Sequence, residues 1–458
     1  MQSTLFDLQP WLSGATASAD APFDGVSTDS RKVAPGNLFV ALRGERFDAH
    51  AFLPQVAQQG AAAVVVERRP EDLSIPALVV PDTRIALAEI ARHWRRQFSL
   101  PVIGVTGSNG KTTVKEMIAA ILAAALGEGK FLATAGNLNN DIGVPLTVLR
   151  FDQKCRAAVI ELGMNHPGEI AVLSAIAQPT VGLVNNAQRE HQEFMASVEA
   201  VAKENGDVLR GLPANGTAVF PADDPFTPLW RAYASEAGQR TISTFGFAAD
   251  ADVTCDYTLQ EFGSDLLVKT AGQQFPVRLA AAGLHNVRNA LAAIACTLAI
   301  DVAPEAVQRG IESFAPVSGR LQRKTAKIGA LVIDDTYNAN PDSVRAAIEV
   351  LANAAAPRIL VLGDMGEVGN EGKKFHEEIG AYARGRNIEH LLTLGELSRH
   401  CSSAFGARAR HYDDIEQLQQ ALQGMVTPAS TILVKGSRFM KMERVVQHLL
   451  GTEEQGSH

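Results

Sequence analysis

Short, continuous runs of apolar residues recur along the chain, separated by longer segments with helical periodicity. Runs of this length, bounded by Gly, Pro or polar residues, predict buried strands. They lie at residues 38–42, 62–67, 77–80, 101–107, 157–162, 181–186, 217–220, 330–335, 358–363, 390–395 and 431–436. Because strands that alternate with helices form parallel sheets covered on both faces, the pattern predicts an α/β protein.

Two of the intervening segments show clear helical faces. From about Thr83, the residues Leu87, Ile90 and Trp94 recur at intervals of three and four, and Asp82 is placed to cap the helix. The second helix follows residue 110, and its predicted apolar face comprises Val114, Met117, Ile118, Ile121, Leu122 and Ala125.

The 458 residues divide into three segments, each with strands and helices of its own. Residues 1–98 predict a small N-terminal α/β domain. Residues 99–315 predict a central parallel-sheet domain. Residues 316–458 predict a Rossmann-like C-terminal domain, which follows a linker containing Pro and Gly at residues 313–322.

Composition narrows the class of protein. The hydrophobic fraction of 46% suits a globular chain, and the net charge of −8 argues against a broad nucleic-acid or anionic membrane surface. We see neither a signal-peptide pattern nor a run near the roughly 20 apolar residues of a membrane span. The four cysteines, Cys155, Cys255, Cys296 and Cys401, lack metal-site spacing and predict reduced, mostly buried thiols. We therefore expect a cytoplasmic protein without nucleic-acid binding or membrane insertion.

The segment GVTGSNGKTTV at residues 104–114 carries the clearest chemistry. A strand ends, glycines let the backbone wrap a phosphate, and a helix begins with its N–H groups toward the anion. Val105 stands where the strict G-x-x-x-x-G-K-[ST] motif has its first Gly. The predicted nucleotide contacts are Gly107, Ser108, Asn109, Gly110, Lys111, Thr112 and Thr113. The loop predicts a P-loop ATPase-like domain but leaves kinase, GTPase, ATPase and ligase open.

This variant loop, together with the segments described next, resembles the Mur ligases and their relatives the folylpolyglutamate synthases. The resemblance spans nearly the whole chain. It implies three domains that bind a UDP-sugar, ATP and an incoming amine, in that order. The implied activity is an ADP-forming, ATP-dependent ligase of an acid and an amino acid or peptide, with Mg²⁺ beside ATP.

The resemblance also implies a metal site. Glu161 ends a predicted strand, where ligands bind in open α/β sheets, and carboxylate and hydroxyl oxygens suit Mg²⁺. The expected ligands are Thr112, Glu161 and His191, and Lys111, His191 and Arg320 are expected to be catalytic.

Relatives carry a carbamylated lysine on the next helix, where an ungapped alignment places Asn205, with Lys203 turned away by about 200°. Either Asn205 replaces the carbamate or the alignment shifts.

Further contacts follow from the resemblance. Around ATP they comprise Asn286, Asn289, Arg320, Asp335, Tyr337 and Asn338. Toward the substrates they comprise Ser30, Arg31 and Arg46 for the UDP-sugar, Asn137 and Asn140 near the γ-phosphate, and Lys435 and Arg438 for the amine. An Arg suits the charge that develops on a transferring phosphoryl group.

The segment D-x-x-Y-N-A-N-P, from Asp335 to Pro341, distinguishes between members of the family. Its form implies UDP-N-acetylmuramoyl tripeptide and D-alanyl-D-alanine as the substrates, and no D-N-P-R signature of the diaminopimelate-adding ligase is present. Folylpolyglutamate synthase, another Mur ligase and a P-loop ATPase acting as a switch or binding module are the alternatives. The resemblance also implies a monomer.

Overall fold

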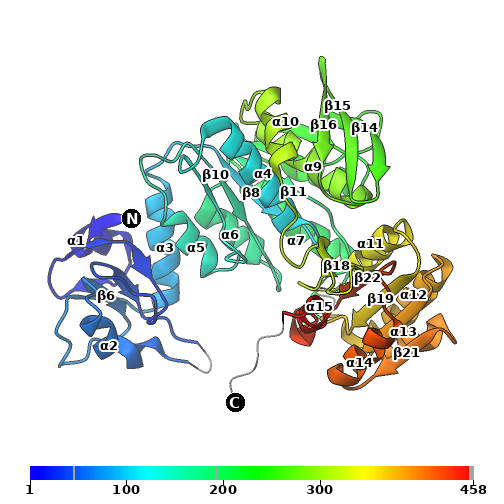
Figure 1. Cartoon of the computed structure of the whole chain (residues 1–458). Coiled ribbons are helices and arrows are strands. Elements are labelled where there is room, and N and C mark those ends of the chain that lie inside the picture. The colour runs from blue at the N-terminus through cyan, green and yellow to red at the C-terminus, as the bar shows by residue number, and fades with distance from the viewer. Residues whose placement is uncertain (45–46, 191–192, 239, 453–458) are drawn as a thin grey trace.

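The computed structural model describes residues 1–44, 47–190, 193–238 and 240–452. Figure 1 shows three bodies, coloured blue, cyan to green, and yellow to red in chain order. Every run predicted as a strand forms one. Within the described part of the chain, no helix is long and apolar enough to cross a membrane.

The N-terminal body is built on a five-stranded sheet in the order β2-β7-β6-β5-β4. Strands β4 to β7 are parallel, whereas β2 joins β7 antiparallel, and β1 pairs separately with β3. The elements are β1 (Gln2–Thr4), α1 (Leu5–Leu8), η1 (Gln9–Trp11), β2 (Thr16–Ala17), β3 (Pro22–Asp24), β4 (Val26–Ser27), β5 (Leu38–Val40), η2 (Ala49–Phe52), α2 (Leu53–Gln58), β6 (Ala63–Val66), β7 (Ala77–Val79) and α3 (Thr83–Arg95).

Helix α3 joins this body to the central one. The Asp82 carboxylate accepts the N–H groups of Arg84 and Ile85, each at 2.8 Å, which is the predicted N-cap. At the other end Arg95 is buried and donates to the Ala177 carbonyl at 2.9 Å. Leu87 and Ile90 belong to a hydrophobic core that continues into the central body. The two bodies therefore share apolar packing.

The central sheet has nine strands in the order β16-β15-β14-β13-β12-β11-β8-β10-β9. Strands β8 to β13 are parallel, as the predicted parallel sheet requires, although β9 and β13 were not themselves predicted. Strand β14 joins β13 in parallel and then pairs antiparallel with β15, as β15 does with β16, and the sequence patterns predicted none of these three strands. The strands are β8 (Val102–Thr106), β9 (Phe131–Ala133), β10 (Ala157–Glu161), β11 (Val181–Val184), β12 (Thr217–Pro221), β13 (Thr241–Phe245), β14 (Val253–Gln260), β15 (Gly263–Thr270) and β16 (Gln273–Leu279). Because β10 and β11 flank β8 on opposite sides, the crevice at their carboxyl ends is a topological switch point.

Helices cover both faces of this sheet. They are α4 (Lys111–Leu126), α5 (Gly143–Val148), α6 (Glu169–Ala177), α7 (Val198–Arg210), α8 (Thr227–Ser235), α9 (Leu284–Leu298) and α10 (Pro304–Ser313). The predicted face of α4 is buried except at Ala125, which is exposed because it lies in the last turn. Helix α4 packs against α9 and α10, and Figure 1 shows these three helices together beside the sheet.

The C-terminal body holds a six-stranded sheet in the order β17-β18-β22-β19-β20-β21, parallel except for β17. Its elements are β17 (Gln322–Thr325), β18 (Leu331–Asp335), α11 (Pro341–Ala352), β19 (Arg358–Gly363), η3 (Gly369–Glu371), α12 (Gly372–Gly385), β20 (His390–Leu394), α13 (Ser398–Phe405), β21 (Ala409–Tyr412), α14 (Ile415–Met425), β22 (Thr431–Lys435), η4 (Arg438–Met440) and α15 (Glu443–Leu450). Asp335 pairs with Lys435 in the register of β18 and β22, so both side chains leave the sheet at its carboxyl edge.

Candidate active site

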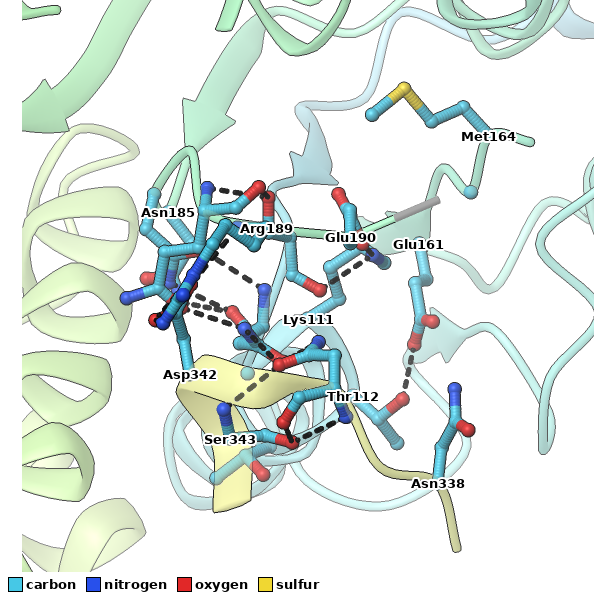
Figure 2. A pocket seen from close by; sticks show the side chains of 18 of the residues that line it. Lys111, Thr112, Glu161, Met164, Asn185, Arg189, Glu190, Asn338, Asp342 and Ser343 are labelled. Carbon is cyan, nitrogen blue, oxygen red and sulfur yellow. Dashed lines mark hydrogen bonds and ion pairs between the residues drawn. The ribbon is translucent and has the colours of Figure 1, made fainter. Parts of the chain in front are cut away.

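A cavity of about 1450 Å³ opens at the switch point of the central sheet and extends to the C-terminal body. Most of the residues expected around ATP and the metal line it, and Figure 2 shows part of its wall. The predicted residues that line it are Ser108, Asn109, Gly110, Lys111, Thr112, Thr113, Asn137, Asn140, Glu161, Asn286, Asn289, Arg320, Asp335, Tyr337, Asn338 and Lys435. Gly107 lies just behind them in the loop.

The phosphate loop depends on its glycines. Gly107 and Gly110 have φ angles of +132° and +82°, in a region that side chains disfavour. A Cβ on Gly107 would lie 2.9 Å from the Cβ of Asn185, and one on Gly110 would lie 2.5 Å from Oδ1 of Asn289. The loop backbone is therefore packed closely against residues behind it and lines the cavity at the start of α4. The free N–H groups at the start of a helix favour an anion.

Lys111 is the first residue of α4 and folds back over the loop. Its Nζ donates to the Gly107 carbonyl at 2.5 Å and to the Ser108 carbonyl at 3.3 Å, and lies 3.5 Å from a carboxylate oxygen of Glu190. Figure 2 shows Lys111 and Glu190 on the same side of the cavity. The ammonium is therefore held where the loop would receive the outer phosphates of a nucleotide.

Thr112, the residue after Lys111, lies beside the Glu161 carboxylate, and both side chains offer oxygen ligands for a hard cation. The Thr112 hydroxyl donates to Oε2 of Glu161 at 2.9 Å, and Asn139 Nδ2 donates to Oε1 of the same carboxylate at 2.8 Å. Glu161 is buried at the end of β10. A carboxylate and a hydroxyl this close suit Mg²⁺, which prefers oxygen. Among the described residues no cluster of three His, Cys, Asp or Glu side chains surrounds a metal position, and His191 lies outside the described residues.

A chain of asparagine amides fixes the loop from behind. Asn185 Nδ2 donates to the Asn109 carbonyl at 2.8 Å and to Asn289 Oδ1 at 2.9 Å. Asn289 donates in turn to Asn286 Oδ1 at 3.1 Å, and Asn286 donates to the Ala282 carbonyl at 2.8 Å. The asparagines at positions 286 and 289 share one face of α9, as predicted, and that face holds the nucleotide loop in place.

Two groups in the wall of the cavity have shifted pKa values. Burial lowers the pKa of the His285 imidazole to about 4, so the ring is neutral at pH 7. Burial also raises the pKa of the Asp224 carboxyl. Close by, Arg288 is paired with Asp223 at 2.5 Å and lies over the Phe247 ring, 5.0 Å from its centroid. The guanidinium and the ring provide a planar surface there.

From the C-terminal side, Arg320 reaches into the phosphate region. Its Nη2 donates to the Thr112 hydroxyl at 2.9 Å, and its guanidinium lies 4.1 Å from the centroid of the Tyr337 ring. Lys435 donates to Asp335 at 2.5 Å and to the Asn338 carbonyl at 2.9 Å. The linker residue and the segment after β18 thus meet the phosphate loop.

Arg320 differs from the other Lys and Arg side chains that line the cavity. Each of the others faces a carboxylate, in the pairs Arg84–Asp141, Lys111–Glu190, Arg189–Asp342, Arg288–Asp223 and Lys435–Asp335. Across the described residues no carboxylate pairs with Arg320, and its buried Nε has no hydrogen-bond partner. A guanidinium beside a Gly-rich loop, with no carboxylate at ion-pair distance among the described residues, is suited to bind an anion.

Asn205 and Lys203, the two residues considered for the lysine position of the relatives, have different surroundings. Asn205 is buried behind the loop, where its Oδ1 accepts the Gly107 N–H at 2.9 Å. Lys203 points to solvent and pairs with Glu199 at 2.7 Å, as its helical offset predicted. Asn205 therefore supports the phosphate loop and does not line the cavity.

Three residues predicted to bind substrate do not line the cavity. Ser30 and Arg31 lie in the N-terminal body, and the Arg31 side chain is 82% exposed and paired with Asp29 at 2.9 Å. Arg438 lies in η4, is 67% exposed and pairs with Glu443 at 3.2 Å, so it faces away from the cavity that Lys435 lines. Arg46 is outside the described residues.

Other residues of the cavity were not predicted. Asn139 lies between the predicted Asn137 and Asn140, Asn340 lies in the segment from Asp335 to Pro341, Asn185 lies near the end of the predicted strand at residues 181–186, and Arg189 lies between that strand and His191. The abundance of Asn in those segments was a usable signal, but which side chain turns inward depends on loop geometry that residue types do not specify.

Comparisons with known proteins cover all three bodies. The model described as Mur ligase family, catalytic domain, matches residues 22–95; the Mur ligase middle domain matches 105–297; and the Mur ligase, glutamate ligase domain, matches 319–438. A protein of Escherichia coli (strain K12) named UDP-N-acetylmuramoyl-tripeptide--D-alanyl-D-alanine ligase is 42% identical over 97% of this chain and 98% of its own.

Solved structures agree with the sequence comparison. The crystal structure of MurF from Acinetobacter baumannii has a TM-score of 0.91 at 34% identity, covering 98% of this chain and 99% of its own. MurF ligase from Thermotoga maritima in complex with ADP has a TM-score of 0.82 at 27% identity, covering 93% of this chain and 97% of its own. The matches run along the whole chain, and the cavity combines a P-loop with an arginine from the linker. The chain therefore belongs to the Mur ligase family.

Proposed function

We propose that this chain is an ATP-dependent, ADP-forming ligase that joins D-alanyl-D-alanine to the terminal carboxylate of UDP-N-acetylmuramoyl tripeptide in peptidoglycan precursor synthesis. The relative at 42% identity bears that activity in its name and is covered almost completely. The structural observation that carries the proposal is the pairing across one cavity of the Lys111 loop with Arg320, which has no carboxylate partner among the described residues. This arrangement is suited to charge on a transferring phosphoryl group.

ATP would lie along the cavity with its phosphates at residues 107–113 and its base toward α9. Asn286, Asn289, Asp335, Tyr337 and Asn338 are the proposed contacts, of which the two asparagines act mainly by holding the loop. Mg²⁺ would be held by the Thr112 hydroxyl and the Glu161 carboxylate, with His191 as a further candidate, and would supply positive charge to the outer phosphates.

The reaction has two transfers. The tripeptide carboxylate attacks the γ-phosphorus, the bond to the β-γ bridging oxygen breaks, and ADP and an acyl phosphate form. The dipeptide amine then attacks the acyl carbon, inorganic phosphate leaves, and the nitrogen loses a proton. Lys111 and Arg320 hold negative charge on the phosphoryl group, and much of the remaining rate enhancement comes from positioning the reactants.

The three bodies would divide the substrates between them. We assign UDP-sugar binding to residues 1–98, ATP binding to residues 99–315 and dipeptide binding to residues 316–458. Ser30, Arg31 and Arg46 are the proposed UDP-sugar contacts. Asn137 and Asn140 lie on the exposed loop at the cavity rim, where the tripeptide would approach the γ-phosphate.

At the dipeptide end, Lys435 is better placed than Arg438, because it lines the cavity and Arg438 faces solvent. The four cysteines are free thiols, which suits a reducing compartment, and we place the enzyme in the cytoplasm as a monomer.

The proposal is tested by measuring ADP release with ATP, Mg²⁺, UDP-N-acetylmuramoyl tripeptide and a panel of amines. The wild-type protein is expected to respond strongly to D-alanyl-D-alanine and weakly to single amino acids. Lys111→Ala should abolish this dipeptide-dependent release, since removal of one such charge-stabilising group costs at least about 10²-fold. Lys203→Ala is the matched control, because that lysine is exposed on the same body.

Near-normal turnover by Lys111→Ala would refute the assignment. Glutamate addition to a folate would favour the folylpolyglutamate synthase alternative, and ATP hydrolysis independent of any acceptor would favour an ATPase module.

A further inference from the structure

The segment at residues 185–190, which follows β11, lies between the phosphate loop and the C-terminal body. On the loop side its contacts are close: Gln188 N–H donates to the Ser108 hydroxyl at 2.9 Å, and Asn109 N–H donates to Asn186 Oδ1 at 2.9 Å. The segment is therefore fixed to the backbone that would bind the nucleotide.

On its other side the segment projects Arg189 into the C-terminal body. Arg189 Nη2 donates to Asp342 Oδ1 at 2.6 Å, and the Arg189 backbone N–H donates to Oδ2 of the same carboxylate at 3.0 Å. Nη1 donates to Glu378 Oε2 at 2.8 Å, and the guanidinium lies 5.3 Å from the centroid of the Phe375 ring. Figure 2 shows the arginine turned toward Asp342. We call Arg189, Asp342 and Glu378 the clasp.

The clasp has the properties of a specific contact. Its side chains are only 23%, 23% and 31% exposed, in the order Arg189, Asp342 and Glu378, and the arginine forks between two carboxylates on different helices, α11 and α12. Such charge-assisted, two-pronged pairs are stronger and more directional than ion pairs in open water. The Arg189 guanidinium holds the pKa of the Glu378 carboxyl below its usual range.

The clasp can also open without leaving either carboxylate isolated. Asp342 lies in the first turn of α11, where the helix N-terminus favours a negative charge. Glu378 keeps a second partner in Arg345, whose Nη1 donates to Oε1 at 2.8 Å. Both carboxylates thus retain favourable partners within the C-terminal body, so the contact with Arg189 is suited to be made and broken.

We propose that Arg189 is a positioning residue that seats the C-terminal body on the phosphate loop and so places the dipeptide amine against the acyl phosphate. This inference rests on the proposed function for its chemistry. The contact made by the clasp does not depend on that function, because it joins two bodies of the chain whatever reaction they catalyse.

The test compares Arg189→Ala, Arg189→Lys, Glu378→Gln and the Arg189→Ala/Glu378→Gln double variant with wild type. Arg210→Ala is the matched control, because Arg210 makes a two-pronged pair with Glu236 at 2.8 and 2.9 Å within the central body. We expect Arg189→Ala to raise KM for D-alanyl-D-alanine at least about tenfold, Glu378→Gln to raise it less, and the double variant to show less than the product of the two effects. Arg189→Lys should recover only part of the loss, because lysine cannot fork between two carboxylates.

A second measurement is independent of activity. Small-angle X-ray scattering without ligands should show a larger radius of gyration for Arg189→Ala than for wild type or Arg210→Ala. An unchanged dipeptide KM in Arg189→Ala, or an unchanged scattering profile, would overturn the clasp while wild-type activity leaves the proposed function intact. A wild-type protein without dipeptide-dependent ADP release would instead overturn the proposed function, and scattering would still decide the clasp.

Discussion

At the scale of single residues, the cavity is organised by amide side chains as much as by charges. Asn185, Asn205 and Asn289 each bind backbone or amide groups of the phosphate loop or its neighbours and are buried. A buried group that loses its hydrogen-bond partner is costly, so the loop groups that bind these amides depend on them. Asn205 offers the clearest test of this support, because its Oδ1 accepts a hydrogen bond from the Gly107 N–H.

Asn205→Leu is expected to raise KM for ATP about tenfold, since the loss of one buried hydrogen bond of about 1–1.5 kcal/mol loosens the first loop residue. The KM for D-alanyl-D-alanine should change little, because Asn205 lies behind the loop and away from the C-terminal body. Steady-state kinetics with each substrate varied in turn make the comparison, and Lys203→Ala on the same helix is the control. An effect on the dipeptide KM as large as that on ATP would contradict a role through Gly107.

The residues that could be predicted are those whose chemistry lies within one continuous motif. Lys111 and Thr112 follow from the loop pattern, and Glu161 from the end of a strand, because each is positioned by the element it begins or ends. Arg189 could not be predicted in the same way. Its partner Asp342 is 153 residues away, and no local pattern records which two loops will meet when separate bodies pack.

At the scale of elements, continuous apolar runs identified β8, β10, β11 and β12 of the central sheet, because both faces of these strands are buried. The parallel strands β9 and β13 were not predicted, because they are only partly buried. The antiparallel strands β14 to β16 were missed because one of their faces is exposed, so their runs are broken by polar residues, as in the alternating burial of Ser264, Leu266 and Val268 with exposed neighbours. Two helices, α3 and α4, were predicted with their apolar faces. The contacts between helices depend on glycines whose neighbours in space the sequence does not show.

Gly310 is the clearest such glycine, where α10 crosses α4. A Cβ there would lie 2.3 Å from Cα and 2.7 Å from N of Ile121, both backbone atoms. Gly310→Ala should therefore destabilise the protein by about 1–3 kcal/mol, the usual cost of overpacking. The control Gly424→Ala lies in the exposed part of α14 with nothing within 4 Å, and should instead stabilise by about 0.5–1 kcal/mol. Urea unfolding followed by circular dichroism measures both, and equal effects of the two substitutions would contradict the crossing as the cause.

At the scale of the whole molecule, the two junctions between bodies differ in kind. One hydrophobic cluster runs from Leu5 through α3 into the central body as far as Trp230, so the N-terminal and central bodies share a core. Among the described residues, the buried clusters of the C-terminal body take in Ala282 from the central body, and the partly buried Phe262 packs against one of them. Its other contacts include the polar pairs of Arg189 and Arg320. Polar junctions are cheaper to open than shared cores, so the C-terminal body is the one expected to move.

If the C-terminal body moves as a unit, its hydrophobic core should stay folded. The buried thiol of Cys401 lies in that core and can be used to test this. The side chain is fully buried in α13, and burial raises the pKa of its thiol to about 12, above the roughly 8.5 of an exposed thiol. As pH rises above about 8.5 the unfolded chain loses this proton while the folded chain keeps it, so stability falls by about 1.4 kcal/mol per pH unit until the folded pKa is reached. Cys401→Ala should remove this pH dependence of the free energy of unfolding, measured by urea unfolding of the C-terminal body between pH 9 and 10.5.

In the wild type, the Cys401 thiol should react with a disulfide reagent only as fast as the C-terminal body unfolds. If opening of the clasp by Arg189→Ala accelerated this labelling as much as urea does, the body would be loosening internally and would not be moving as a unit.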